Sequence, residues 1–282
     1  MKLIRYSFHD QVHAGVLTAK GVVPVTAINA YTGSNVPDTV LGIIESGDLA
    51  PLAAAETLPA IPYDQVMPLL PYPVPPKIWC IGLNYHSHAV DIKAVQPDEP
   101  GSLMKPASCM FRPGGDIVLP PERVTNDVDA EGELAVVIGK RSQYLKDHAE
   151  ALDAIFGYTV TLDLTALDVL AKNPRYLTRS KSFDTFFSFG PVIVTKDEIP
   201  DPQDLHIRVL QNGKEVMTAH TADMICNLRQ HIRFLTSCLT LRPGDLITTG
   251  TPAGVSRLAP GDKLHGTISG IGSMALDVVA DN

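Results

Sequence analysis

The segment Asp129–Lys140, DAEGELAVVIGK, places two carboxylates at the start of an otherwise apolar run. The run predicts a buried β-strand that stops at Gly139, and successive side chains of a strand point to opposite faces. Glu131 and Glu133 therefore share one face, about 6.6 Å apart along the strand. Like charges held this close repel each other unless a positive group lies between them. The fold and the function both depend on what that positive group is.

Two explanations fit the spacing of these glutamates. Charged residues commonly guard an exposed strand edge against pairing with another chain. Alternatively, carboxylates that converge at strand ends suit a hard divalent cation such as Mg²⁺, Mn²⁺ or Ca²⁺, which prefers oxygen ligands. Asp163, at the end of the strand predicted for GYTVTLD (157–163), is the candidate for a third carboxylate. The spacing alone favours an edge, and a third carboxylate at the same place would favour the metal.

Composition describes an ordinary globular protein. The 282 residues are 45% hydrophobic and 19% charged, with a net charge of −8. A chain without a basic run and with this acidic balance argues against nucleic acid or an anionic membrane as a partner. No stretch approaches the roughly 20 apolar residues of a membrane helix, and the N-terminus lacks a signal-peptide pattern, so we expect a cytoplasmic protein. The four cysteines are widely spaced and predict reduced thiols rather than disulfides or a zinc site.

The chain divides at a proline-rich segment. Seven of the 23 prolines fall within residues 59–76, where they exclude regular helix or central strand. We therefore predict a small α+β domain with its linker over residues 1–72, and a catalytic domain over residues 73–282. The second part is rich in strands and lacks the βα alternation of a doubly wound sheet. The predicted fold class is α+β with a predominance of strands.

Three local patterns are specific enough to predict elements. Residues 147–156 form a predicted helix, capped by Asp147 and ended by Gly157. Asn212-Gly213 lies between two β-rich runs and predicts a hairpin. Apolar residues repeat with helical spacing from Met224 to Leu239 and predict a second helix.

A pair of residues with general-base character follows the predicted strand 77–85. In GLNYHSHAVD (82–91), one helical turn would bring His88 and Asp91 together. A carboxylate beside a histidine fixes its tautomer and raises its basicity. A loop histidine that bonds only to solvent or backbone is the simpler explanation, and Asp91 makes His88 a better candidate than His86.

Two further segments combine polar groups with an apolar setting. In KSFDTFFSFGP, Lys181 precedes an aromatic run, where it could meet a substrate carboxylate or lie exposed on a loop. In TTGTPAGV, Thr249 and Thr251 with the backbone N–H groups near Gly250 could form an anion-binding concavity or an ordinary turn. Motifs for a nucleophilic serine, a P-loop and an H-E-x-x-H zinc site are absent.

These segments, taken in order, resemble the fumarylacetoacetate hydrolase family. The resemblance covers nearly all of residues 77–280 and runs through IGLNYHSHAVD, LMKPAS, EGELAVVIGK, GYTVTLDLTALD, KSFDTFFSFGP, QNGKEV and PGDLITTGTPAGV. It implies a mixed β-roll or β-sandwich catalytic domain behind a small N-terminal domain. It also implies a protein that is usually a homodimer and uses Mg²⁺ or Mn²⁺ on 2,4-dioxo acids and related substrates.

The resemblance implies roles for individual residues and for the positive group between Glu131 and Glu133. It implies that the positive group is a divalent cation held by three metal ligands, and that His88 with Asp91 and Lys181 are catalytic. The implied metal ligands are Glu131, Glu133 and Asp163. The implied substrate contacts are Tyr85, Lys105, Lys181 and Thr251.

Two departures from the family pattern affect this assignment. The family commonly has glutamate where this chain has Asp91, which is one methylene shorter. The family also commonly has arginine where this chain has Leu167, so a cation near the site is lost.

The implied reaction is metal-dependent hydrolysis of a C–C bond in a 2,4-dioxo acid of the acylpyruvate or fumarylpyruvate type, through a metal-bound enolate. Isomerisation, decarboxylation or dehydration of a 2-keto or 2-hydroxydienoic acid on the same scaffold is the alternative. A third possibility is a metal-stabilised domain without catalysis, although a general-base pair has no use in a purely structural site.

Overall fold

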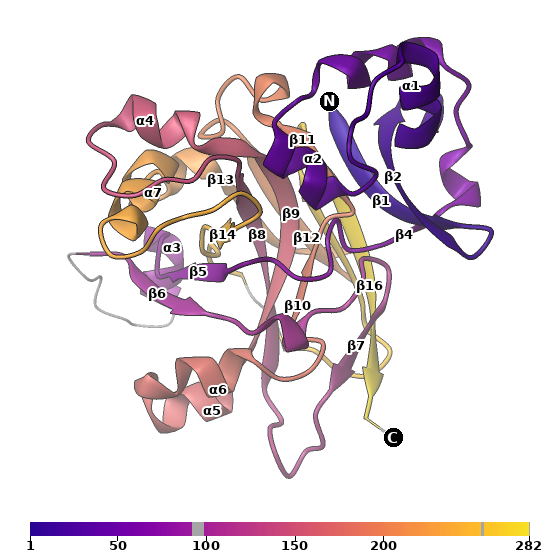
Figure 1. Ribbon diagram of the computed structural model, residues 1–282. Coiled ribbons are helices and arrows are strands. Elements are labelled where there is room, and N and C mark those ends of the chain that lie inside the picture. Colours follow the sequence, from indigo (N-terminus) through magenta and orange to yellow (C-terminus); the bar gives the residue numbers. More distant parts are fainter. Residues whose placement is uncertain (92–98, 255–256, 282) are drawn as a thin grey trace.

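The computed structural model describes residues 1–91, 99–254 and 257–281 and consists of two mixed β-sheets with short helices around them (Figure 1). The larger sheet has 11 strands and the order β3-β2-β1-β11-β9-β8-β14-β5-β6, with β10 beside β9 and β4 beside β1. The smaller sheet has the order β13-β12-β15-β16-β7. Side chains of both sheets belong to one hydrophobic cluster, so the predicted strand-rich α+β fold is confirmed.

The strands of the larger sheet are β1 (Lys2–Phe8), β2 (Gln11–Thr18), β3 (Gly21–Pro24), β4 (Met67–Pro68), β5 (Ile78–Gly82), β6 (Gly101–Met104), β8 (Val128–Ile138), β9 (Ile155–Ala166), β10 (Phe187–Phe189), β11 (Val192–Thr195) and β14 (Leu246–Thr248). Those of the smaller sheet are β7 (Asp116–Leu119), β12 (His206–Gln211), β13 (Lys214–His220), β15 (Lys263–Ile268) and β16 (Gly272–Ala280).

The α-helices are short. They are α1 (Val25–Thr32), α2 (Val40–Ser46), α3 (His86–Asp91), α4 (His148–Asp153), α5 (Leu167–Lys172), α6 (Leu177–Lys181) and α7 (Leu228–Thr236). The 3₁₀-helices are η1 (Ala50–Thr57), η2 (Tyr63–Gln65), η3 (Ala107–Cys109), η4 (Pro174–Tyr176), η5 (Lys196–Glu198) and η6 (Thr221–Asp223). No helix in the described ranges is long and apolar enough to cross a membrane.

Strands β8 and β9 form the centre of the larger sheet. Every residue of both strands is buried, and β8 lies between β9 and β14 (Figure 1). Strand β8 begins at Val128, so Glu131 and Glu133 lie within a central strand. The explanation of these glutamates as guards of a strand edge is therefore wrong, because β8 has a hydrogen-bonded neighbour on each side.

The N-terminal residues extend the larger sheet. Strand β1 pairs with β2 on one side and with β11 on the other, where Lys2 lies opposite Val194. Helices α1 and α2 cover this end of the sheet, at the upper right of Figure 1. The predicted domain boundary near Pro73 falls between β4 and β5 and remains a prediction.

Turn and capping residues account for the local elements that the sequence predicted correctly. Asn212 and Gly213 both have positive φ, 54° and 78°, and join β12 to β13 as the predicted hairpin. Gly47 ends α2 in the left-handed conformation. Asp147 caps α4, since its side chain accepts hydrogen bonds from the N–H groups of Ala149 and Glu150.

Both helices are shorter in the structure than the sequence predicted. Helix α4 ends at Asp153, because Ile155 already belongs to the buried strand β9. Helix α7 begins at Leu228 rather than near Met224, since Asn227 forms a capping box there. Met224 pairs with Tyr85 instead of continuing the helix.

His231 on α7 gives the first testable prediction. Its side chain is 1% exposed, neither ring nitrogen has a hydrogen-bond partner within the described ranges, and burial lowers its pKa to about 4. As pH falls below about 6.5, the unfolded chain takes up a proton at this position and the folded chain does not until about pH 4. The stability that His231 contributes is therefore present above pH 6.5 and lost between pH 6.5 and 4.

We expect His231→Met to weaken the loss of stability on acidification, measured by urea unfolding at pH 7 and pH 5. The exposed histidine His265 provides the control, and His265→Met should leave the wild-type pH dependence in place. An unchanged pH dependence in His231→Met would contradict this account.

Candidate metal centre

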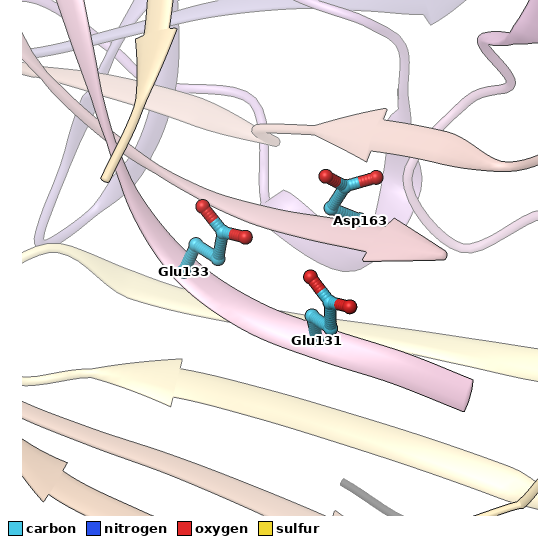
Figure 2. Close-up of side chains that lie close together, drawn as sticks. All are labelled: Glu131, Glu133 and Asp163. Atoms are coloured by element: carbon cyan, nitrogen blue, oxygen red, sulfur yellow. The ribbon is translucent and has the colours of Figure 1, made fainter. Parts of the chain in front are cut away.

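Two neighbouring strands bring three carboxylates together. Glu131 and Glu133 project from one face of β8, and Asp163 lies directly opposite Glu131 on β9 (Figure 2). One oxygen atom from each side chain lies within 4.8 Å of the others. The three residues are 7%, 1% and 1% exposed, respectively. The third carboxylate that the metal interpretation requires is therefore present beside the first two.

Two lysines contact this carboxylate cluster. Lys181, at the end of α6, places its Nζ 2.8 Å from Glu131 Oε2 and 3.1 Å from Asp163 Oδ2. Lys105 donates a hydrogen bond to Asp163 Oδ1 and another, 2.9 Å long, to the backbone carbonyl of Phe186. Asp163 thus contacts both ammonium groups and Glu131 contacts one.

Neutral donors complete the cluster. The hydroxyl of Thr165 donates to Glu131 Oε1 at 2.7 Å, and the backbone N–H of Gly250 donates to Glu133 Oε2 at 2.7 Å. Glu133 differs from the other two carboxylates, because among the described residues it forms no ion pair with a lysine.

The lack of a lysine partner at Glu133 in the described part of the chain is reflected in the pKa values of the carboxylates. Burial, followed by the charges of Asp163 and Glu131, raises the pKa of Glu133 to about 8. Burial alone would also raise the pKa of Asp163, but Lys105 and Lys181 lower it below its ordinary value. The carboxylates in turn raise the pKa of Lys181 against the opposing effect of burial, so this lysine stays charged. The cluster has three carboxylates but, among the described residues, only two ammonium groups, and the raised pKa of Glu133 reflects the missing positive charge.

The donor set fits a divalent cation. Three buried carboxylates offer only oxygen ligands, the type that Mg²⁺ and Mn²⁺ prefer. A cation beside Glu133 would replace the proton that its raised pKa otherwise favours. Glu131, Glu133 and Asp163 could therefore hold the metal, with Lys181 and Lys105 behind the ligands that they contact.

The second prediction concerns the metal-free protein. Because the pKa of Glu133 is about 8 when folded and about 4.5 when unfolded, the folded chain holds an extra proton between these values. The contribution of Glu133 to the stability of the folded chain is therefore complete below pH 4.5 and is lost as the pH rises towards 8. Glu133→Gln should therefore stabilise the protein in EDTA at pH 8, with a smaller gain at pH 5, as measured by melting temperature. A gain that is larger at pH 5 than at pH 8 would contradict the assigned charge deficit.

The predicted substrate contacts occupy different settings. Tyr85 is 1% exposed, and its hydroxyl has no hydrogen-bond partner among the described residues. Burial and then the charge of Glu133 raise the pKa of this hydroxyl, so it remains a proton donor near the cluster. Thr251 follows the glycine that contacts Glu133, and its Oγ1 lies 3.5 Å from Met217 Sδ.

Lys105 is buried against the carboxylate cluster. Its side chain is 0% exposed, and its ammonium already contacts Asp163 and the carbonyl groups of Leu164 and Phe186. The structure thus places Lys105 as a partner of Asp163, and its predicted contact with substrate remains a prediction.

His88 and Asp91 are both in α3, which supplies the predicted single turn of helix between them. Their side chains lie outside the described part of the structure, so the predicted dyad remains a prediction.

Sequence analysis missed the role of three polar groups. Thr165 follows Asp163 by two residues and therefore shares its strand face, a periodicity that could have identified it. The backbone N–H of Gly250 lies in the segment predicted as an anion-binding concavity, but its partner is the side chain of Glu133, and the concavity itself remains a prediction. Asn84 lies in the GLNY segment but has no local pattern that indicates its distant partners.

The chain belongs to the fumarylacetoacetate hydrolase family. The sequence profile described as "Fumarylacetoacetate (FAA) hydrolase C-terminal" matches residues 77–279, which include all three carboxylates of the cluster. Members of this family are enzymes, and relatives of this chain include hydrolases, isomerases and tautomerases.

Three relatives show this range. A mitochondrial oxaloacetate tautomerase of Bos taurus is 35% identical over 279 residues, which are 95% of this chain and 87% of the relative. The crystal structure of maleylpyruvate hydrolase from Sphingobium sp. SYK-6, in complex with manganese(II) and pyruvate, is 31% identical with a TM-score of 0.82 and covers 100% of both chains. The structure of 2-hydroxyhepta-2,4-diene-1,7-dioate isomerase from Mycobacterium marinum is 30% identical with a TM-score of 0.78 and covers 100% of this chain and 99% of that one.

Proposed function

We propose that this protein is a divalent-metal-dependent hydrolase that cleaves a C–C bond in a 2,4-dioxo acid of the acylpyruvate or fumarylpyruvate type. One observation carries the proposal: Glu131, Glu133 and Asp163 converge within 4.8 Å in the core, where Glu133 lacks a cationic partner among the described residues. The manganese and pyruvate in the related maleylpyruvate hydrolase support the choice of metal and of an oxo acid.

The charge balance of the site favours an anionic substrate. Lys105 and Lys181 offset two of the three carboxylates, and a divalent cation would leave the centre with one excess positive charge. A 2-oxo acid brings a carboxylate and an adjacent carbonyl oxygen, both of which suit such a centre. When bound, Mg²⁺ or Mn²⁺ would act as a Lewis acid towards these oxygens.

The protein's own residues would orient the substrate and move its protons. Lys181 remains charged, because the neighbouring carboxylates raise its pKa, so it can neutralise negative charge that develops on the substrate. The hydroxyl of Tyr85 has no hydrogen-bond partner in the described part of the chain and can donate to a substrate oxygen. His88, oriented by Asp91, would take a proton from the water that attacks the remote carbonyl.

A second candidate is keto–enol tautomerisation of a small 2-oxo dicarboxylic acid such as oxaloacetate. The observation that favours it is the 35% identity to the mitochondrial oxaloacetate tautomerase of Bos taurus across 95% of this chain. This reaction needs the same metal and the same charge balance, but it uses a proton shuttle instead of an attacking water.

The third prediction distinguishes the two reactions. Acylpyruvates, dicarboxylic dienols and oxaloacetate would each be followed by the ultraviolet absorbance of the enol, with Mn²⁺ and again with EDTA, and the products identified. We expect metal-dependent loss of absorbance together with pyruvate and a second carboxylic acid. Absorbance changes without new products would establish tautomerisation instead. Turnover that persists in EDTA would contradict both candidates.

The fourth prediction concerns the general base. His88→Ala should cut hydrolysis by roughly 10² to 10⁴-fold, the usual contribution of a positioned base, and leave Mn²⁺ affinity unchanged. His86, an exposed residue two positions earlier in α3, provides the matched control, and His86→Ala should hydrolyse like the wild type. Wild-type hydrolysis by His88→Ala would exclude His88 as the base.

A further inference from the structure

Asn84 is a buried residue outside the metal cluster that joins three separate segments of the chain. It is 3% exposed and follows β5, the strand that leads into α3. Its Nδ2 donates a 2.8 Å hydrogen bond to the carbonyl of Thr249, and its Oδ1 accepts one of 2.9 Å from the N–H of Cys226. Its backbone carbonyl accepts a third, 2.7 Å long, from the N–H of Ile225.

The contact between Asn84 and Thr249 determines which way one peptide group points. The carbonyl of Thr249 and the N–H of Gly250 belong to the same planar peptide unit and point in opposite directions. Asn84 holds the carbonyl end, and the N–H end donates to Glu133 Oε2 at 2.7 Å. A rotation of this peptide would break both hydrogen bonds together.

Local packing restricts this peptide further. Gly250 has a φ of +84°, which residues with a side chain rarely adopt. A Cβ atom added there would lie 3.0 Å from Asn84 Cβ and 3.2 Å from the carbonyl oxygen of Ile81. The site thus requires glycine at this position, and Asn84 lies against it.

We propose that Asn84 is a positioning residue: by fixing the Thr249–Gly250 peptide, it holds the Glu133 carboxylate in the orientation that binds the metal. The inference rests on the proposed metal-dependent function and deepens it. Glu133 depends on this N–H more than the other carboxylates would, because it has no ion pair with a lysine among the described residues. Groups that hydrogen-bond to metal ligands are worth about 10- to 100-fold in metal affinity.

The test measures Mn²⁺ affinity of the full chain by electron paramagnetic resonance, which detects free Mn²⁺ without any substrate. Asn84→Ala should weaken Mn²⁺ binding by about 10- to 100-fold. The matched control is Asn29→Ala in the N-terminal part of the chain, where an asparagine also bridges a carbonyl and an N–H, both of Val36. Asn29→Ala should bind Mn²⁺ like the wild type.

A double-variant measurement separates positioning from a loss of general stability. Gly250→Ala alters the same peptide, so its effect and that of Asn84→Ala should combine to less than the product of the two. Independent, multiplicative effects would overturn the proposal, as would wild-type affinity in Asn84→Ala. Should Asn84→Ala fail to fold, wild-type Mn²⁺ affinity in Gly250→Ala would overturn it equally.

Two reference samples distinguish failure of this inference from failure of the proposed function. If the wild type binds Mn²⁺ and Glu133→Gln does not, the metal centre is established, and unchanged binding by Asn84→Ala refutes only the positioning role. If Glu133→Gln binds Mn²⁺ as tightly as the wild type, the metal assignment fails and the role of Asn84 fails with it.

Discussion

The structure around the carboxylate cluster depends on one electrostatic constraint: three carboxylates share a buried site on two paired strands. Burial and mutual repulsion both disfavour their charged forms, and the surrounding chain answers with Lys181, Lys105 and several hydrogen-bond donors. Those groups suffice for Asp163, whose pKa is lowered, but not for Glu133, whose pKa rises to about 8. A site that opposes its own ionisation in this way is costly for the fold, and a bound divalent cation would remove that cost.

The same constraint explains why these elements surround the cluster. Strands β8 and β9 supply the three carboxylates, α6 supplies Lys181, and the segment after β14 supplies the N–H that contacts Glu133. Segments far apart in the sequence thus converge on one charged site in the centre of the larger sheet. The structures of the related hydrolase and isomerase share this fold, and the tautomerase is related in sequence, which fits a common scaffold whose chemistry is varied by the residues around the site.

Local patterns in the sequence predicted those features that depend on a few neighbouring residues. The Asn212-Gly213 hairpin and the Asp147 cap follow from backbone conformation and short-range hydrogen bonds, and both were predicted correctly. The shared face of Glu131 and Glu133 follows from strand periodicity, but whether β8 lay at an edge depended on its neighbours β9 and β14, which no local pattern reveals. The start of α7 was misplaced although the capping box of Asn227 and Gln230 is a local signal, whereas the pairing of Met224 with Tyr85 from a distant segment has no such signal. The end of the predicted strand 157–163 made Asp163 a candidate third carboxylate, and resemblance to a family, rather than local pattern, assigned it to the same site as the two glutamates.

The most direct test of the central claim is an anomalous difference map from crystals of the protein grown with Mn²⁺. The account predicts a single strong peak between Glu131, Glu133 and Asp163, with a carboxylate oxygen from each in direct contact with the ion. It also predicts that Glu133 still accepts the hydrogen bond from the Gly250 N–H. A map with no peak at these carboxylates under saturating Mn²⁺, or with the ion bound only elsewhere, would contradict the claim that this buried cluster is a metal centre.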